Sequence, residues 1–300
     1  MVGIPTLMST ARLSVGRPTR RVDTVAAMAQ RWSVGEIEIT RIDSSNFVLP
    51  SSNPTPGWAV PMFTRSVDEA PIAFSAIMIR SGPETIVVDP WIVDDSPRSR
   101  PDAEVVVEGL LAELAQIGVA ADDVTFVVNS HIDGIGWNTR PGTGGPSARE
   151  WCPTFPNARY LFPADELAAV NRGVPINGSE HLGPLADAGI IEAIDAPFDV
   201  APGVSLTAAP GHNYGHVAVR VEQGDALAVY PGHLVLSLTQ VDDPECDLGD
   251  TDVVVASACR RSILNELAER RGILLTTLIG GPGGGIVEAH DTGFRLSPAD

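Results

Sequence analysis

The chain contains no lysine. All 20 of its basic residues are arginine, and 38 acidic residues give the chain a formal net charge of −18. The absence of lysine excludes a side-chain Schiff base and the lysine of a phosphate-binding P-loop. Such an acidic surface also repels phosphate backbones and anionic lipid. We therefore expect a small molecule as the partner, and neither nucleic acid nor a membrane.

Cysteine is also scarce, and no two of Cys152, Cys246 and Cys259 form a close pair. An odd number of unpaired cysteines argues against a disulfide framework and against a cysteine-rich zinc site. Isolated thiols are typical of a reducing compartment. The sequence therefore indicates a cytoplasmic protein.

Long hydrophobic runs are missing as well, because no apolar stretch approaches the roughly 20 residues of a membrane span. Residues 1–30 carry arginines but lack the continuous apolar stretch of a secretory signal. We expect a disordered tail or an over-extended start there, with Met28 as an alternative first residue. The rest is globular in composition, since 44% apolar residues and a mean hydropathy of +0.10 can supply a sizeable core.

Apolar and alternating segments predict strands, and amphipathic spacing with end signals predicts helices. The predicted strands are 36–40, 74–80, 85–89, 124–128, 158–162, 204–208, 217–221, 226–230 and 273–279. The predicted helices are 102–117, one beginning at Pro163, and one capped by Ser257 that runs to Arg271. Residues 50–61, 140–157 and the lysine-free glycine cluster 280–285 are expected to be loops. This mixture indicates layered sheets covered by helices.

The most informative stretch is Asn-Ser-His-Ile-Asp-Gly at 129–134, directly after the apolar run 124–128. Pro-Gly-His-Asn-Tyr-Gly-His at 210–216 and Pro-Gly-His at 231–233 also stand beside predicted strands. Four metal-capable side chains share this placement: His131, Asp133, His212 and His233. A single histidine at a strand end is more often a hydrogen-bonded loop residue. The set of four slightly favours one shared site, because loops at strand ends hold ligands rigidly.

This series of strand ends resembles the metallo-β-lactamase-fold hydrolases. The resemblance covers most of the chain from Trp32 to Leu296, and it is most specific at 130–139, 153–161 and 209–216. It implies an α/β fold, a four-layer αββα sandwich in a single domain over residues 31–297, with the site at one edge between the sheets. In that family a His-x-His-x-Asp-His motif and a later His, Asp and His bind two metals, usually zinc, that activate water.

The first motif of the family is only half kept. Asn129 stands at the first histidine of the motif. His131 and Asp133 keep the second histidine and the aspartate, whereas Gly134 replaces the third histidine. The resemblance therefore implies that one ligand is missing at each of the two metal positions.

The later positions are also only partly kept. His212 matches the mid-chain histidine, His233 stands where the family has its bridging aspartate, and Leu278 stands at the last histidine. His216 matches a family position that is not a ligand. With Gly134 and Leu278 in place, only Asp133 remains at the second metal position, so we expect that position to be empty.

Our leading hypothesis is a mononuclear site in which His131, His212 and His233 bind one zinc or another divalent ion. Three neutral imidazoles with an open coordination position are a known arrangement for activating water. Asp133 would take a proton from that water or orient it. Asn129 would bind a substrate carbonyl or complete the coordination weakly. The expected reaction is hydrolysis of an ester, lactone, thioester or amide bond.

Two other hypotheses remain open at this stage. In the first, the chain has lost its metal, and the old pocket binds a small molecule or catalyses a cyclase or lyase step. In the second, the chain is a non-catalytic partner protein. The sequence does not identify the substrate or the oligomeric state.

Overall fold

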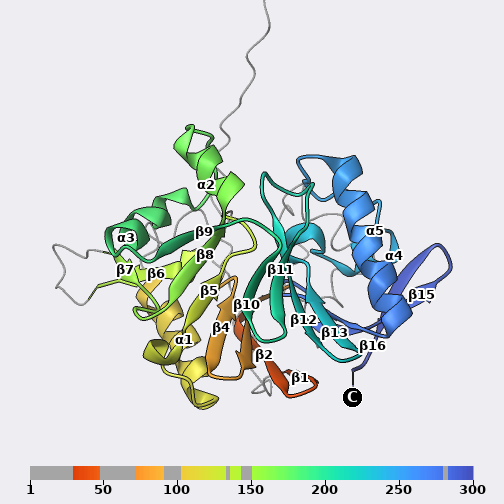
Figure 1. Cartoon of the computed structure of the whole chain (residues 1–300), viewed down its shortest axis with the longest axis horizontal. Helices are drawn as coiled ribbons and strands as arrows, with labels where there is room; N and C mark the ends of the chain where they lie inside the picture. Colours follow the sequence, from red (N-terminus) through yellow and green to blue (C-terminus); the bar gives the residue numbers. More distant parts are fainter. Residues whose placement is uncertain are drawn as a thin grey trace, which may run out of the picture.

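The computed structural model describes residues 30–47, 72–90, 103–132, 136–142, 151–279 and 283–299. The predicted tail at 1–30 lies outside these ranges except for its last residue, and the predicted loop at 50–61 lies outside them entirely. In the described part, two large sheets pack face to face and helices cover their outer sides (Figure 1). The predicted four-layer αββα sandwich is therefore confirmed.

The first sheet has seven strands in the order β1-β2-β3-β4-β5-β8-β9. These are β1 Arg31–Val34, β2 Ile37–Phe47, β3 Ile72–Ser81, β4 Glu84–Val88, β5 Phe126–Val128, β8 Arg159–Pro163 and β9 Ile191–Ile194. Strands β1 to β4 pair antiparallel, and β4, β5, β8 and β9 pair parallel. The helices on its outer side are α1 Ala103–Gln116, α2 Ala164–Asn171 and α3 Leu182–Asp187.

The second sheet also has seven strands, in the order in which they occur in the chain. These are β10 Phe198–Ala201, β11 Val204–Ala208, β12 Val217–Gln223, β13 Ala226–Tyr230, β14 Ile273–Leu275, β15 Gly284–His290 and β16 Gly293–Ser297. Helices α4 Leu238–Asp242 and α5 Val253–Arg270 connect β13 to β14, and these two strands are parallel. A small third sheet pairs β6 Thr139–Pro141 with β7 Trp151–Pro153.

Alternation along the strands separates the apolar side chains into three cores, as four layers require. On β3, Ile77 and Ile79 face the core between the two sheets, whereas Ala76 and Met78 face the core beneath α1 to α3. The third core lies between the second sheet and α5, and it includes Leu264. Because both faces of each sheet are covered in the described part of the chain, a site formed by these residues is expected at the sheet edges.

The adjacent predicted strands 74–80 and 85–89, and 217–221 and 226–230, pair as the hairpins β3–β4 and β12–β13. Several boundaries were predicted wrongly: β2 extends to Phe47 instead of ending at residue 40, and β15 begins inside the predicted loop 280–285. The predicted loop 140–157 contains most of β6 and all of β7. Helix α5 begins at Val253 because the carboxylate of Asp252 caps it by accepting the Val255 N–H (3.1 Å). Ser257 lies inside the helix, and its hydroxyl donates to the carbonyl of Val253 (2.6 Å).

The predicted strand 273–279 is shorter than expected. Strand β14 ends at Leu275; the N–H of Thr276 still binds the carbonyl of Gly283 in the β14–β15 register (2.8 Å), and its hydroxyl shares that carbonyl (2.9 Å). The apolar pattern of the sequence did not reveal this contact.

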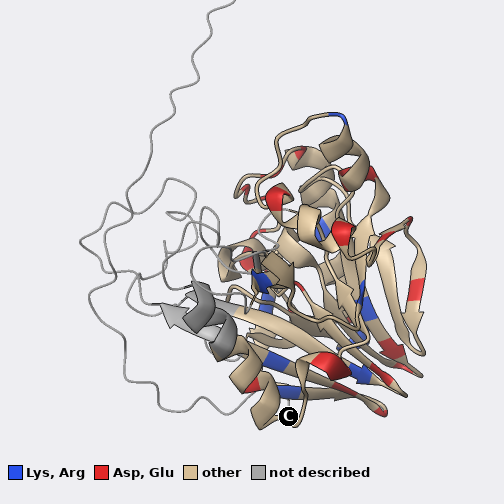
Figure 2. Cartoon of the chain, turned by 90° about the vertical axis from the view of Figure 1, so that its left-hand side faces the viewer, with Lys and Arg blue, Asp and Glu red and all other residues tan. Residues whose placement is uncertain are grey.

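The charged residues are spread over the surface. In the view of Figure 2, acidic residues lie on several helices and strand ends and do not gather into one patch. None of the helices in the described ranges has the length and apolarity needed to cross a membrane.

Truncation of a side chain in the third core tests the packing. Leu264 is fully buried (0% exposed), whereas Val254, on the same helix, is 79% exposed. We expect Leu264→Ala to lower the free energy of unfolding by about 2–5 kcal/mol because it leaves a cavity. The control Val254→Ala should change it by less than about 0.5 kcal/mol. Urea denaturation measures both, and equal losses would contradict the placement of α5.

Candidate metal centre

The loops that carry the predicted ligands meet at one edge of the sandwich. Residues 129–132 follow β5 in the first sheet, and residues 209–216 connect β11 to β12 in the second. The turn Gly232–Leu234 follows β13. A backbone hydrogen bond from the N–H of Val217 to the carbonyl of Ser130 (3.0 Å) joins the two sheets here.

His131, His212 and His233 lie together at this edge. One nitrogen from each ring falls within 4.8 Å of the others. The ring centroids are 4.3 Å apart for His131 and His233, 5.3 Å for His131 and His212, and 5.4 Å for His212 and His233. Three side chains that are far apart in the sequence thus converge on one point.

Hydrogen bonds occupy the outer nitrogen of two of these rings. Nδ1 of His212 lies 2.9 Å from Oδ1 of Asp250. Nδ1 of His131 lies 2.9 Å from the hydroxyl of Ser130, which donates its own proton to Asp89 and therefore accepts from the ring. Both rings carry their proton on Nδ1 in this arrangement, which leaves a lone pair on Nε2.

The contact between His131 and His233 has the length of a hydrogen bond, somewhat shorter than the spacing that one metal ion would impose, and the three candidate nitrogens all lie within 4.8 Å of one another. Nε2 of His131 lies 2.9 Å from Nδ1 of His233. Two nitrogens bound to one tetrahedral zinc ion are about 3.3 Å apart, given bonds of about 2.0–2.1 Å. The donor set is suitable, because three imidazoles leave a fourth position for water or substrate.

Burial keeps the rings of His131 and His233 neutral. It lowers the pKa of His131 and of His233 well below the ordinary value, and repulsion from the neighbouring histidines lowers them further. The neutral imidazole is the form that binds a metal.

A fourth ring, His216, is part of the cluster but cannot act as a ligand. Its Nδ1–H donates to the carbonyl of Ala209 (3.1 Å), and its Nε2 accepts the backbone N–H of His233 (3.2 Å). Burial, with repulsion from His212, lowers its pKa to about 3. His216 therefore supports the turn that carries His233, consistent with the non-ligand position that the resemblance gives it.

Gly232 is required for this close packing. It has a φ of +56°, and a Cβ there would lie 2.5 Å from Nε2 of His216 and 2.8 Å from the hydroxyl of Ser130. Any larger residue would push the two loops apart.

Asp89 lies beneath the cluster, and the sequence did not identify it as part of the site. Its carboxylate accepts the N–H of Ser130 (2.7 Å), the hydroxyl of Ser130 and the hydroxyl of Tyr230 (2.8 Å). Burial raises the pKa of Asp89 to about 6, although these hydrogen bonds oppose the rise. The hydroxyl of Ser130 lies between the imidazole of His131 and the carboxylate of Asp89, and it donates its proton to the carboxylate. Ser130 is therefore not arranged as a nucleophile that a histidine activates. The signal in the sequence was an Asp-Pro pair ending a strand.

Asn129 and Leu278 are both buried. The amide oxygen of Asn129 accepts from Asn138 (2.9 Å), and its NH₂ group donates to the carbonyl of Leu161 (3.3 Å). Direct contact of Asn129 with a substrate therefore stays a prediction. Leu278 is 6% exposed and supplies no ligand atom.

Asp133 and Gly134 lie outside the described residues. The loop just before them is anchored, because the N–H of Ile132 donates to a carboxylate oxygen of the buried Glu166 (2.5 Å). The sequence analysis did not identify this second buried carboxylate.

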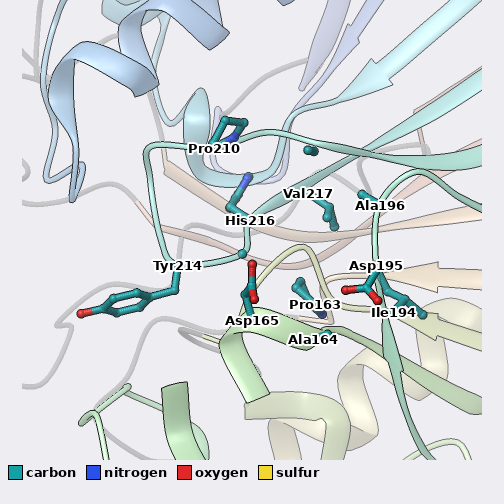
Figure 3. Close-up of a pocket in the computed structure, with 12 residues that line it drawn as sticks. Pro163, Ala164, Asp165, Ile194, Asp195, Ala196, Pro210, Tyr214, His216 and Val217 are labelled. Atoms are coloured by element: carbon teal, nitrogen blue, oxygen red, sulfur yellow. The ribbon is translucent and has the colours of Figure 1, made fainter. Parts of the chain in front are cut away.

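A cavity of about 210 Å³ lies on the other side of the 209–216 loop. Figure 3 shows Asp165 and Asp195 on one side of it and His216 on another, with Tyr214 pointing away. None of the three converging imidazoles lines this cavity. It is therefore separate from the candidate metal centre.

No protein-family model and no curated protein sequence matches this chain. Several solved structures are nevertheless similar to it in fold. AidC, a dizinc quorum-quenching lactonase in complex with a product, is 19% identical with a TM-score of 0.68, over 91% of this chain and 97% of that chain. AbOPH, a hydrolase in the β-lactamase superfamily, is 16% identical with a TM-score of 0.67, over 92% and 99%.

A probable metal-dependent hydrolase from Staphylococcus aureus is 14% identical with a TM-score of 0.63, over 89% of this chain and 99% of that chain. Identities this low establish a shared architecture and nothing about the reaction. Together with the two packed sheets and their outer helices, these likenesses show that the chain has the metallo-β-lactamase fold.

Proposed function

We propose that this protein is a metal-dependent hydrolase that uses one divalent ion, with zinc as the best fit, to cleave an ester, lactone, thioester or amide bond in a small molecule. The observation that carries the proposal is the convergence of His131, His212 and His233 within 4.8 Å. Two of the rings are also held so that Nε2 keeps its lone pair. Similar structures include a dizinc lactonase, which supports hydrolysis of this bond class.

A single ion, in contrast to the two of AidC, follows from the residues at the second position. Leu278 is a buried apolar side chain, and Gly134 has no side chain to offer. Asp133 alone cannot hold a second ion, because a zinc site needs three or four protein ligands.

The chemistry follows from the ligand set and its neighbour Asp133. His131, His212 and His233 would hold the ion, which would supply a more acidic water and polarise a substrate carbonyl. Asp133, two residues after His131, takes the proton from the attacking water or orients it. Asn129 supports the start of this loop through its bonds to Asn138 and Leu161.

Metal content provides the first test. After loading with zinc and dialysis, we expect the wild-type protein to hold about one ion per chain by elemental analysis. His131→Ala and His212→Ala should each fall below about 0.1 ion per chain, because two imidazoles bind too weakly. His290→Ala is the matched control, because that side chain is 47% exposed on β15, outside the three-imidazole cluster. A wild-type protein that retains no more zinc than the alanine variants would refute the metal site.

Activity provides the second test. A panel of esters, lactones, thioesters and amides should contain a substrate that the zinc-loaded protein hydrolyses. We expect Asp133→Asn to lower kcat/KM on that substrate by roughly 10²–10⁴-fold while zinc content stays unchanged, because only the proton acceptor is lost. Asp122→Asn, a change at an exposed aspartate, is the control. Equal activity of Asp133→Asn and wild type would remove Asp133 from the mechanism.

The same experiments separate the alternative functions. Turnover without any bound metal, still dependent on Asp133, would favour a metal-free cyclase or lyase. Inactivity on every small molecule together with a stable protein complex would favour a non-catalytic partner protein.

A further inference from the structure

Asp250 lies in the short segment between α4 and α5. Asp247 shapes the turn before it, because its Oδ1 accepts the N–H groups of Gly249 (2.9 Å) and Asp250 (3.0 Å). The side chain of Asp250 is only 2% exposed. The turn thus directs a carboxylate into the interior, toward the loop that carries His212.

The two oxygens of Asp250 have different partners. Oδ1 lies 2.9 Å from Nδ1 of His212, and Oδ2 accepts from Nη2 of Arg260 (2.7 Å). Burial raises the pKa of Asp250, but the hydrogen bonds from His212 and Arg260 outweigh it, and the net shift is downward. An ionised carboxylate can only accept, so His212 must donate from Nδ1.

Arg260 extends this contact to a second ligand. Its side chain is fully buried, and its Nε donates to the carbonyl of Leu234, the residue after His233. Its Nη1 donates to the carbonyl of Pro244 (2.5 Å). One rigid guanidinium on α5 therefore binds both the partner of His212 and the turn that carries His233.

We propose that Asp250 and Arg260 are positioning residues that set the geometry of two metal ligands. Asp250 keeps the proton of His212 on Nδ1, so that Nε2 is the coordinating atom. Arg260 holds Asp250 and the turn after His233 at a fixed separation. The inference rests on the proposed metal site, but the position of the proton on His212 can be measured without metal.

The substitution Asp250→Asn replaces one acceptor oxygen by a donor NH₂ group with almost no change in the shape of the side chain. An asparagine has one oxygen and one NH₂ group, and the oxygen must face Arg260, which only donates. The NH₂ group then faces Nδ1 of His212 and requires a lone pair there. The ring proton moves to Nε2, where coordination needs the lone pair.

Nitrogen-15 NMR of histidine-labelled, metal-free full-length protein near neutral pH measures the proton position directly. The variant His212→Gln identifies the signals of His212. We expect an Nδ1–H ring in the wild type and an Nε2–H ring in Asp250→Asn. Asp247→Asn is the matched control and should behave as the wild type, because an amide oxygen can accept the same two backbone N–H groups.

Zinc affinity, measured by competition with a chromophoric chelator, separates the two positioning residues. We expect Asp250→Asn to bind zinc roughly 10–100-fold more weakly than the wild type. Arg260→Lys should also bind zinc more weakly while keeping the Nδ1–H ring, because one ammonium cannot replace the fork that reaches both Asp250 and Leu234.

An Nε2–H ring on His212 in the wild type overturns the proposal. An unchanged ring and unchanged zinc affinity in a folded Asp250→Asn variant also overturn it. If the wild type binds no zinc, the proposed function fails, and the NMR comparison alone decides the positioning role. If Asp250→Asn does not fold, the wild-type ring and the affinity of Arg260→Lys decide it.

Discussion

Four histidine rings meet at the edge of this sandwich, three of them buried and His212 partly buried, and the rest of the site depends on how their N–H groups are satisfied. A buried polar group without a partner is costly, and a buried charge is more so. His131, His212 and His216 each have an acceptor for Nδ1–H: a hydroxyl, a carboxylate and a backbone carbonyl respectively. These bonds fix which nitrogen of each ring keeps its lone pair, and they allow the rings to stay neutral and close.

The acceptors come from both sheets, so the site depends on the packing of the sandwich. Asp89 follows β4 of the first sheet, and it accepts from Ser130 of the same sheet and from Tyr230 of the second. The backbone hydrogen bond between Val217 and Ser130 joins the two sheets at the same edge. Between the layers the contacts are apolar and adaptable, whereas at this edge directional hydrogen bonds hold the two sheets in register. That rigidity is what a ligand set for one small ion needs.

Strand alternation and helix spacing are local patterns, and they predicted layered sheets covered by helices but missed β1, β9, β10 and β16; the four-layer order came from the resemblance to the metallo-β-lactamase-fold hydrolases. The placement of His131, Asp133, His212 and His233 beside apolar strands slightly favoured one shared site, and the resemblance then selected the three histidines as ligands. Prediction from the sequence failed where a residue acts through a distant partner. Nothing local to Asp250 or Arg260 indicates that they meet, because they are ten positions apart in the sequence and the contact depends on the packing of α5.

Asp89 was missed for a related reason. An aspartate followed by proline at the end of a strand usually ends the strand and has no further role. Asp89 contacts Ser130, 41 residues away in the sequence, and Tyr230, 141 residues away, and these contacts depend on how the strands pair. The start of α5 was misplaced because Asp252 and Ser257 are both good caps, and only the folded chain decides between them.

The ligand nitrogens are divided between the two halves of the molecule, with His131 in the first sheet and His212 and His233 in the second. An ion bound by all three residues would link the two halves of the molecule. Neither half alone could hold it, so the unfolded chain would bind it poorly. The free energy of unfolding would then rise with the concentration of free metal, by about 2.7 kcal/mol at a concentration 100 times the dissociation constant. Availability of the ion in the surroundings would thereby regulate the lifetime of the protein as well as its chemistry.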